Sequence, residues 1–270
     1  MLVRCLQIES PDHESEGDRI DRMIAELGAH QDADLVVLPE LWATGYFSFD
    51  DYESSATRPD GLFVETMRDA ARNNGIWLHA GTYLERSQSG IANCALLIDP
   101  SGDVSLEYRK IHLFGYQSKE ARILTAGDDI EVAVTPIGTI ATSTCYDLRF
   151  PEQYRVLSDL GAEVVIIPAA WPLVRVHHWR SLLIARAIEN QAWVISCNSA
   201  GDQRGTTLAG TSMIIDPAGV VVAEAGVAPA VIQAEVDVAG VAAIRNEFPV
   251  LEHRRIEIAL RPRPGTSRSV

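Results

Sequence analysis

The chain has 270 residues, 47% of them hydrophobic, which is enough for one large core, so we predict a single domain over 1–270. A net charge of −14 would repel a phosphate backbone and argues against nucleic-acid binding. No run of about eighteen apolar residues predicts a membrane helix, and we expect the cytoplasm by default. The four cysteines lack the spacing of a metal site or a disulfide framework, so we expect no metal and no cofactor.

The first part of the chain alternates strand and helix patterns. Residues 1–9 favour a strand and not a signal peptide, because charged and polar residues interrupt the apolar ones. Residues 18–28 carry the apolar spacing of an amphipathic helix. Residues 34–38 are typical of a fully buried strand that stops at Pro39. Glu40 is then a carboxylate held just past a strand end.

The next part repeats this arrangement. Residues 61–74 predict a second amphipathic helix, and residues 104–109 predict a strand that is followed at once by Lys110. The segment 111–129 shows no pattern of regular structure. Loops of this length in compact domains are usually functional or disordered.

A cysteine follows the next strand. Residues 138–142 are β-prone, and Cys145 comes shortly after them, before a helix over 151–160 that begins with Pro151. The residues around the thiol are polar or charged, which argues against a purely structural cysteine. Open α/β sheets place their chemistry at the carboxyl ends of their strands, so Cys145 is a candidate nucleophile.

The two halves of the chain share one order of elements. A buried strand with proline, a strand with tryptophan and an Asp-Pro turn recur, and a helix over 177–191 belongs to the second set. The paired segments are 33–39 and 162–168, 76–80 and 192–196, and 97–102 and 214–219. Two similar α/β halves would stack sheet on sheet, which predicts a four-layer αββα sandwich with the active site where the halves meet.

Three motifs carry a family resemblance. They are Leu-Pro-Glu at Glu40, Arg-Lys-Ile-His-Leu-Phe at Lys110, and Cys-Tyr-Asp-Leu-Arg-Phe-Pro-Glu at Cys145. In this order and spacing they resemble the Glu–Lys–Cys triad of the carbon–nitrogen hydrolase (nitrilase) superfamily, and the resemblance covers nearly the whole chain. It implies the αββα fold and catalytic roles for these three residues. It also implies that Glu120 is a second glutamate, which positions the lysine or the substrate.

The triad suggests a covalent mechanism. Glu40 is the candidate base for the thiol, and the neighbouring ammonium of Lys110 would favour the thiolate. Attack on an amide carbon creates an oxyanion, for which Lys110 and the backbone N–H of Tyr146 are candidate donors. Loss of ammonia leaves a thioester on Cys145, which water then hydrolyses.

A resemblance to one branch of this superfamily suggests the class of substrate. Tyr-Asp after the cysteine resembles the amidase branch, and residues 170–179 and 185–191 resemble omega-amidases, which deamidate ω-amides of 2-oxo dicarboxylic acids. A small anionic amide entering this acidic protein needs a local cation, and Arg175 lies after a buried strand at the same sheet edge. The candidate pocket aromatics are Tyr46, Phe114, Tyr146 and Trp171.

Several alternatives stay open at this point. The scissile bond could belong to an N-carbamoyl compound, deaminated glutathione or a nitrile. A cysteine–histidine hydrolase would use His112, His177 or His178 as its base, and a catalytically silent binding module would keep only the fold. The resemblance also implies a homodimer with helices near 151–160 and 177–191 at its interface. The basic residues within about 250–270 predict a tail on the surface or on a partner subunit.

Overall fold

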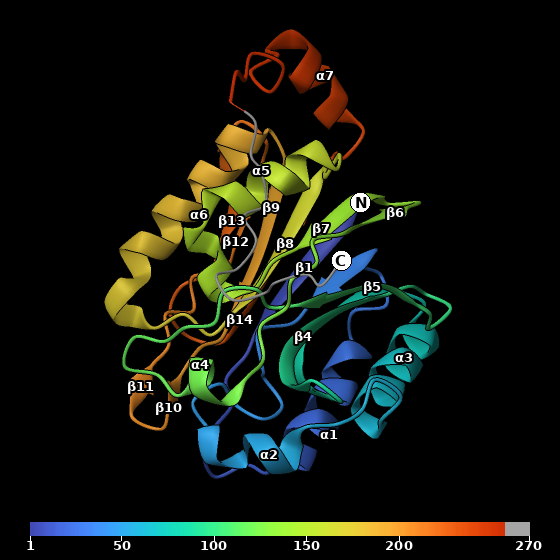
Figure 1. Ribbon diagram of the computed structural model, residues 1–270. Coiled ribbons are helices and arrows are strands. Elements are labelled where there is room, and N and C mark those ends of the chain that lie inside the picture. The colour runs from blue at the N-terminus through green and yellow to red at the C-terminus, as the bar shows by residue number, and fades with distance from the viewer. Residues whose placement is uncertain (257–270) are drawn as a thin grey trace.

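The computed structural model describes residues 1–256, and it contains two stacked six-stranded sheets with helices on their outer faces. Figure 1 shows α1 and α3 on one side of the pair of sheets and α5 and α6 on the other. The bounds of the helices are α1 Glu16–Leu27, α2 Tyr52–Ser55, α3 Leu62–Asn74, α4 Glu120–Ile123, α5 Pro151–Asp159, α6 Val176–Asn190 and α7 Gly240–Glu247. The predicted αββα sandwich is therefore confirmed.

The first sheet has the strand order β14-β1-β2-β3-β4-β5 and the second has the order β13-β12-β9-β8-β7-β6. The strands of the first sheet are β1 Leu2–Gln7, β2 Leu35–Val37, β3 Trp77–Ser87, β4 Gly90–Ile98, β5 Val104–Arg109 and β14 Ala230–Glu235. Those of the second are β6 Val132–Thr135, β7 Gly138–Thr142, β8 Val164–Ala169, β9 Trp193–Asn198, β12 Met213–Ile215 and β13 Val221–Glu224. A small hairpin joins β10 Asp202–Gln203 to β11 Thr206–Thr207.

The two sheets repeat one topology, as the paired sequence segments predicted. In the first, β1, β2 and β3 are parallel, and β4 and β5 follow antiparallel. In the second, β7, β8 and β9 are parallel, and β12 and β13 follow antiparallel. The Asp-Pro turns end at Gly102 and Gly219, which both have φ of +87°, a conformation that glycine adopts without strain.

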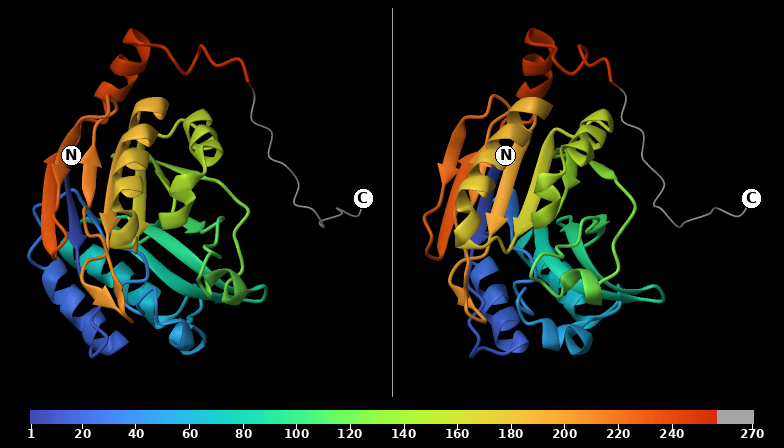
Figure 2. Two further views of the ribbon diagram at one scale, coloured as in Figure 1. Left: turned by 90° about the vertical axis from the view of Figure 1, so that its left-hand side faces the viewer. Right: turned by 60° about the vertical axis from the view of Figure 1, so that its left-hand side comes forward.

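The halves are also joined by a late strand that pairs with the first sheet, a feature that the sequence did not predict. Strand β14 comes late in the chain but pairs antiparallel with β1, so it completes the first sheet. The two views of Figure 2 show α7 beyond one end of the sheets. Arg245 of α7 donates hydrogen bonds to the carbonyls of Ala162, Asn190 and Gln191, which fixes the helix to the second half.

Three apolar layers hold the sandwich together. The layer between the sheets includes Val37 and Trp77 from one half and Ile166 and Trp193 from the other. A second layer lies between α1, α3 and the first sheet, and a third lies between α5, α6 and the second sheet. Since polar groups are costly in such layers, the buried charges near the site require specific partners.

Sequence and structure differ at several boundaries. Strand β2 ends at Val37, before Pro39, whereas β8 continues past Pro168 to Ala169. The segment 111–129, expected to be irregular, contains the short helix α4, which begins at Glu120. Of the predicted tail, Arg254 forms an ion pair with Asp159 on α5. Residues 257–270 lie outside the described part, so the role of the tail stays a prediction.

No helix among residues 1–256 combines the length and apolar character needed to cross a membrane.

Candidate active site

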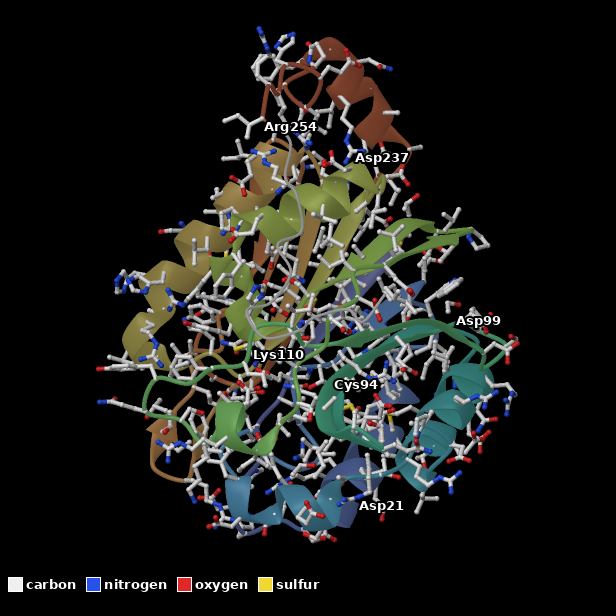
Figure 3. The ribbon with its side chains drawn as sticks, in the orientation of Figure 1. Asp21, Cys94, Asp99, Lys110, Asp237 and Arg254 are labelled. Carbon is white, nitrogen blue, oxygen red and sulfur yellow. The ribbon has the colours of Figure 1, made fainter. Side chains whose placement is uncertain are left out.

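The four predicted catalytic residues meet at one edge of the sandwich. Glu40 follows β2, Lys110 follows β5, Glu120 begins α4, and Cys145 follows β7. Strand β5 runs in the same direction as β2, because two antiparallel pairings separate it from the parallel strand β3. The carboxyl ends of β2 and β5 therefore lie at the same edge. Figure 3 shows Lys110 near the centre of the molecule, whereas Asp21 and Asp99 lie toward its periphery.

Lys110 bridges the two glutamates. Its Nζ lies 2.8 Å from Oε1 of Glu40 and 2.8 Å from Oε1 of Glu120, and all three side chains are fully buried. Glu120 is therefore buried beside the lysine, and its role in positioning the lysine or the substrate stays a prediction. An ammonium has three N–H donors, so two bonds to carboxylates leave one donor for a substrate.

Each glutamate has further donors. The Nδ2 of Asn93 on β4 is 2.8 Å from Glu40 Oε1, and the backbone N–H of Ala170 donates to Glu40 Oε2 at 2.9 Å. Glu120 accepts from the Tyr46 hydroxyl at 3.1 Å and from the Phe114 backbone N–H at 2.7 Å. These bonds offset part of the cost of burying both charges and hold each carboxylate in one orientation.

The thiol lies in a sharp turn between β7 and α5. Cys145 has φ of +48°, a region that L-residues rarely occupy, and it is 8% exposed. Leu41, the residue after Glu40, has φ of +44°. Both turns aim a reactive side chain out of a strand end, and the surrounding packing must maintain them.

Asp147 connects the cysteine turn to the lysine segment. Its buried carboxylate accepts from the backbone N–H of Thr144 at 2.9 Å and from the Tyr108 hydroxyl at 2.7 Å. It also accepts from the backbone N–H of His112 at 2.9 Å and lies 2.8 Å from His112 Nδ1. One carboxylate thereby fixes the segments that carry Lys110 and Cys145 relative to one another.

Burial and the charges around Cys145 favour a protonated, neutral thiol in the resting enzyme. Burial and the nearby Glu40 carboxylate raise the pKa of Cys145 well above its usual range, and Lys110 offsets this only in part. The predicted influence of Lys110 is therefore correct in sign but insufficient to produce a resting thiolate. Burial also raises the pKa of Glu40, with Lys110 opposing and Glu120 reinforcing the shift.

Lys110 remains an ammonium. Burial alone would lower its pKa, but Glu120 and Glu40 outweigh this effect and raise the pKa well above the usual value. The Glu40 carboxylate lies close enough to the Cys145 thiol for each group to shift the pKa of the other. Proton transfer from sulfur to carboxylate can thus accompany attack on a substrate.

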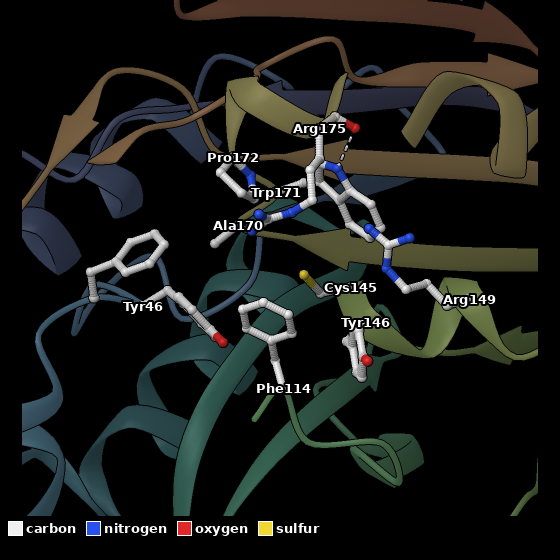
Figure 4. A pocket seen from close by; sticks show the side chains of 10 residues that line it. Tyr46, Phe114, Cys145, Tyr146, Arg149, Ala170, Trp171, Pro172 and Arg175 are labelled. Carbon is white, nitrogen blue, oxygen red and sulfur yellow. Dashed lines mark hydrogen bonds between the residues drawn. The ribbon is translucent and has the colours of Figure 1, made fainter. Parts of the chain in front are cut away.

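A small pocket opens above the sulfur. It has a volume of about 340 Å³, including its mouth, and Figure 4 shows the Cys145 sulfur among its lining side chains. All five predicted substrate-binding residues line it, although their contact with substrate stays a prediction. The lining residues are Tyr46, Phe47, Phe114, Cys145, Tyr146, Arg149, Ala170, Trp171, Pro172 and Arg175.

Two guanidinium groups border this pocket. Arg175 packs over the Phe114 ring at 5.4 Å, and Arg149 packs over the Trp171 ring at 4.6 Å. Within residues 1–256 neither guanidinium forms an ion pair with a carboxylate, so both charges are available to an anion. Sequence reasoning selected Arg175 and missed Arg149, although Arg149 stands in the quoted cysteine motif.

Asn93 was missed as well. A single asparagine inside the buried apolar strand β4 is the sequence signal that could have identified it.

The histidines do not support a cysteine–histidine pair. Strand β5 ends at Arg109, so His112 does not share a strand face with Lys110, and its Nδ1 lies against Asp147. His177 and His178 are on α6, where the two rings pack against one another. Glu40 is the carboxylate whose charge acts directly on the thiol and raises its pKa.

One group of possible metal donors occurs among residues 1–256, at Glu85, Cys94 and Glu107. Arg109 already bridges its two carboxylates, with Nε 2.6 Å from Glu85 Oε2. We assign no metal to this group.

In this αββα sandwich a thiol that lines a small pocket lies near a buried cluster of two carboxylates and an ammonium, an arrangement suited to hydrolysis through a covalent intermediate. The chain belongs to the carbon–nitrogen hydrolase family, whose profile matches residues 2–246.

Individual relatives agree with this assignment. The chain is 39% identical to the 2-oxoglutaramate amidase of Paenarthrobacter nicotinovorans, over 95% of this chain and 90% of that protein. It is 32% identical to a deaminated glutathione amidase of Dictyostelium discoideum, over 93% and 92%. The crystal structure of Saccharomyces cerevisiae Nit3, a member of the nitrilase superfamily, superposes with a TM-score of 0.86 at 28% identity, over 95% and 97%. The chain is an enzyme that acts on carbon–nitrogen bonds.

Proposed function

We propose that this protein hydrolyses the terminal amide of a small 2-oxo dicarboxylic acid to the free acid and ammonia, through a thioester on Cys145. The observation that carries the proposal is the pocket itself, where the Cys145 thiol, under the influence of the Glu40 charge, lies beside two guanidiniums that have no carboxylate partner among residues 1–256. The relative named 2-oxoglutaramate amidase supports the same substrate class.

In the first half-reaction the sulfur attacks the amide carbon while its proton passes to Glu40. The developing oxyanion accepts from the remaining N–H of Lys110 and from the backbone N–H of Tyr146. Collapse of the tetrahedral adduct breaks the C–N bond. Glu40 returns the proton to the departing nitrogen, ammonia leaves, and the acyl group stays on sulfur.

In the second half-reaction Glu40 removes a proton from water as the water oxygen attacks the thioester. Lys110 and Tyr146 again stabilise the oxyanion. The C–S bond then breaks, and Cys145 recovers its proton as the carboxylic acid leaves. Glu40 therefore acts as base, acid and base again, which requires that its carboxylate keep one position throughout.

Glu120 has a supporting role in this scheme. It accepts a second hydrogen bond from Lys110 and one from the hydroxyl of Tyr46, a lining residue of the pocket. We propose that it fixes the ammonium toward the oxyanion instead of exchanging protons with the substrate.

Substitution of Arg175 tests whether the substrate is anionic. We expect Arg175→Ala to lower kcat/KM, mainly through KM, for an ω-amide that ends in a carboxylate, because a charge-assisted bond contributes roughly 1.5–3 kcal/mol, or about ten- to a hundred-fold. The measurement is ammonia release from two amides of equal length, one ending in a carboxylate and one in a methyl group. Arg175→Lys should recover only part of the loss, because lysine lacks the planar pair of donors.

Arg149→Ala provides a second variant in the same comparison, because it removes the other guanidinium that has no carboxylate partner among residues 1–256. Equal losses on the anionic and the neutral amide would make both arginines structural. That result would favour a neutral amide, an N-carbamoyl compound or a nitrile, and the same assay can compare these. Activity on deaminated glutathione alone would instead assign the chain to the function named for the Dictyostelium relative.

A homodimer with α5 and α6 at its interface and a cytoplasmic location remain part of this proposal.

A further inference from the structure

A histidine that the proposed mechanism does not use lies between the two sheets. His79 is on β3, is 0% exposed, and shares the inner face of the first sheet with Trp77. Its Nε2 is 3.0 Å from Oγ1 of Thr142, the last residue of β7 in the second sheet. The imidazole thus forms a polar contact across a layer that is otherwise largely apolar.

The direction of this hydrogen bond follows from its surroundings. The Thr142 hydroxyl donates to the carbonyl of Ile166 at 3.1 Å, so its oxygen accepts from the Nε2–H of His79. Burial lowers the pKa of His79 to about 3, so the ring is neutral at any pH used for assay. Its Nδ1 has no hydrogen-bond partner among the described residues.

The strand segment that begins at His79 also holds the Glu40 turn. The carbonyl of His79 accepts from the backbone N–H of Leu38 at 3.0 Å, and the backbone N–H of Thr82 donates to the Pro39 carbonyl at 3.3 Å. The backbone N–H of Leu41 donates to the Thr82 hydroxyl at 2.9 Å. Residues on both sides of Glu40 are therefore fixed to β3.

Thr142, the partner of His79 in this contact, lies close in the chain to the nucleophile Cys145. Thr142 precedes Cys145 by three residues, and the backbone N–H of Ser143 donates to the same Ile166 carbonyl at 3.1 Å. The contact between His79 and Thr142 is hence a short connection between the turn that carries the base and the turn that carries the thiol.

We propose that His79 is a positioning residue, whose hydrogen bond to Thr142 sets the separation between the Glu40 carboxylate and the Cys145 thiol. The inference rests on the proposed function, because it assumes that these two groups exchange a proton. A misplacement of about 1 Å in such a pair can reduce a rate by about a hundred-fold.

Thr142→Val and Thr142→Ser form the matched test. Valine has the shape of threonine without the hydroxyl, and we expect kcat to fall about ten- to a hundred-fold with KM nearly unchanged. Serine keeps the hydroxyl and should recover most of the rate. His79→Leu should resemble Thr142→Val, whereas His79→Gln, which keeps an N–H donor, should be milder. The double variant His79→Leu/Thr142→Val should lose no more than Thr142→Val alone, because both substitutions remove the same contact between His79 and Thr142.

The control for packing is Ile140→Val, which changes an apolar residue on the inner face of the same strand and should lower only the unfolding temperature. The rate of Cys145 alkylation by iodoacetamide is measured beside kcat. This rate needs no substrate, so it reports on the thiol and Glu40 even if the proposed substrate proves wrong. Wild-type kcat and alkylation in Thr142→Val would overturn the inference, as would losses in rate no larger than those of Ile140→Val.

Discussion

Cys145→Ala is expected to reduce turnover on the order of 10⁴-fold or more while the fold stays intact. The substitution removes the atom that forms the thioester, and the exposed side of that atom faces a pocket and not a packed core. Ammonia release measures the activity, and a thermal melt reports the fold. A well-folded variant that keeps its activity would show that another group is the nucleophile.

Alkylation supplies an independent control. Cys5, Cys94 and Cys197 are all 0% exposed, so one fast-reacting thiol is expected in the native protein. Substrate should protect this thiol, and Cys145→Ala should lack the fast phase. Four slow thiols, none protected by substrate, would favour the silent binding module over the enzyme.

Glu40→Gln is expected to lower kcat by about 10²- to 10⁴-fold, the usual contribution of a general acid–base group. The glutamine amide is similar in shape but cannot accept the thiol proton or activate water. Because both half-reactions need this proton transfer, a slowly formed acyl group should accumulate on Cys145. Mass spectrometry of the variant after mixing with substrate detects this adduct at the peptide that contains Cys145.

The pH profile separates this role from a structural one. The pKa of Glu40 is raised by burial above the ordinary glutamate value of 4.5, and the reaction needs the ionised carboxylate. The alkylation rate of the wild-type enzyme should therefore fall as pH decreases through that raised pKa. Glu40→Gln should lack this acid limb. An identical limb in the variant would assign the titration to another group.

The sequence predicted the parts of the site that follow regular elements. Glu40, Lys110 and Cys145 each come shortly after a strand that the sequence predicted, and the family motifs added Glu120. Helices α1, α3, α5 and α6 also lie close to their predicted positions, and the apolar stripe is clearest in α1 and α3.

The missed features depend on contacts between distant segments. Asp147 acts through donors at Tyr108 and His112, and His79 acts through Thr142 on the other sheet. The pairing of β14 with β1 joins opposite ends of the described chain, so no local pattern could indicate it. The net pKa of Cys145 also depends on burial, which the neighbouring residue types alone do not reveal.

The most direct test of the thioester is a partition experiment with hydroxylamine. Two substrates with the same acyl group but different leaving groups are compared, the ω-amide and the corresponding methyl ester. Both are tested at one fixed hydroxylamine concentration, and the rate measured with Cys145→Ala is subtracted as the uncatalysed reaction. The ratio of hydroxamate to acid is then measured for each substrate. A common thioester on Cys145 predicts the same ratio from both substrates, because the acyl-enzyme no longer carries the leaving group. Ratios that differ, or an amide reaction that yields acid but no hydroxamate, would contradict a covalent intermediate and favour direct attack by water.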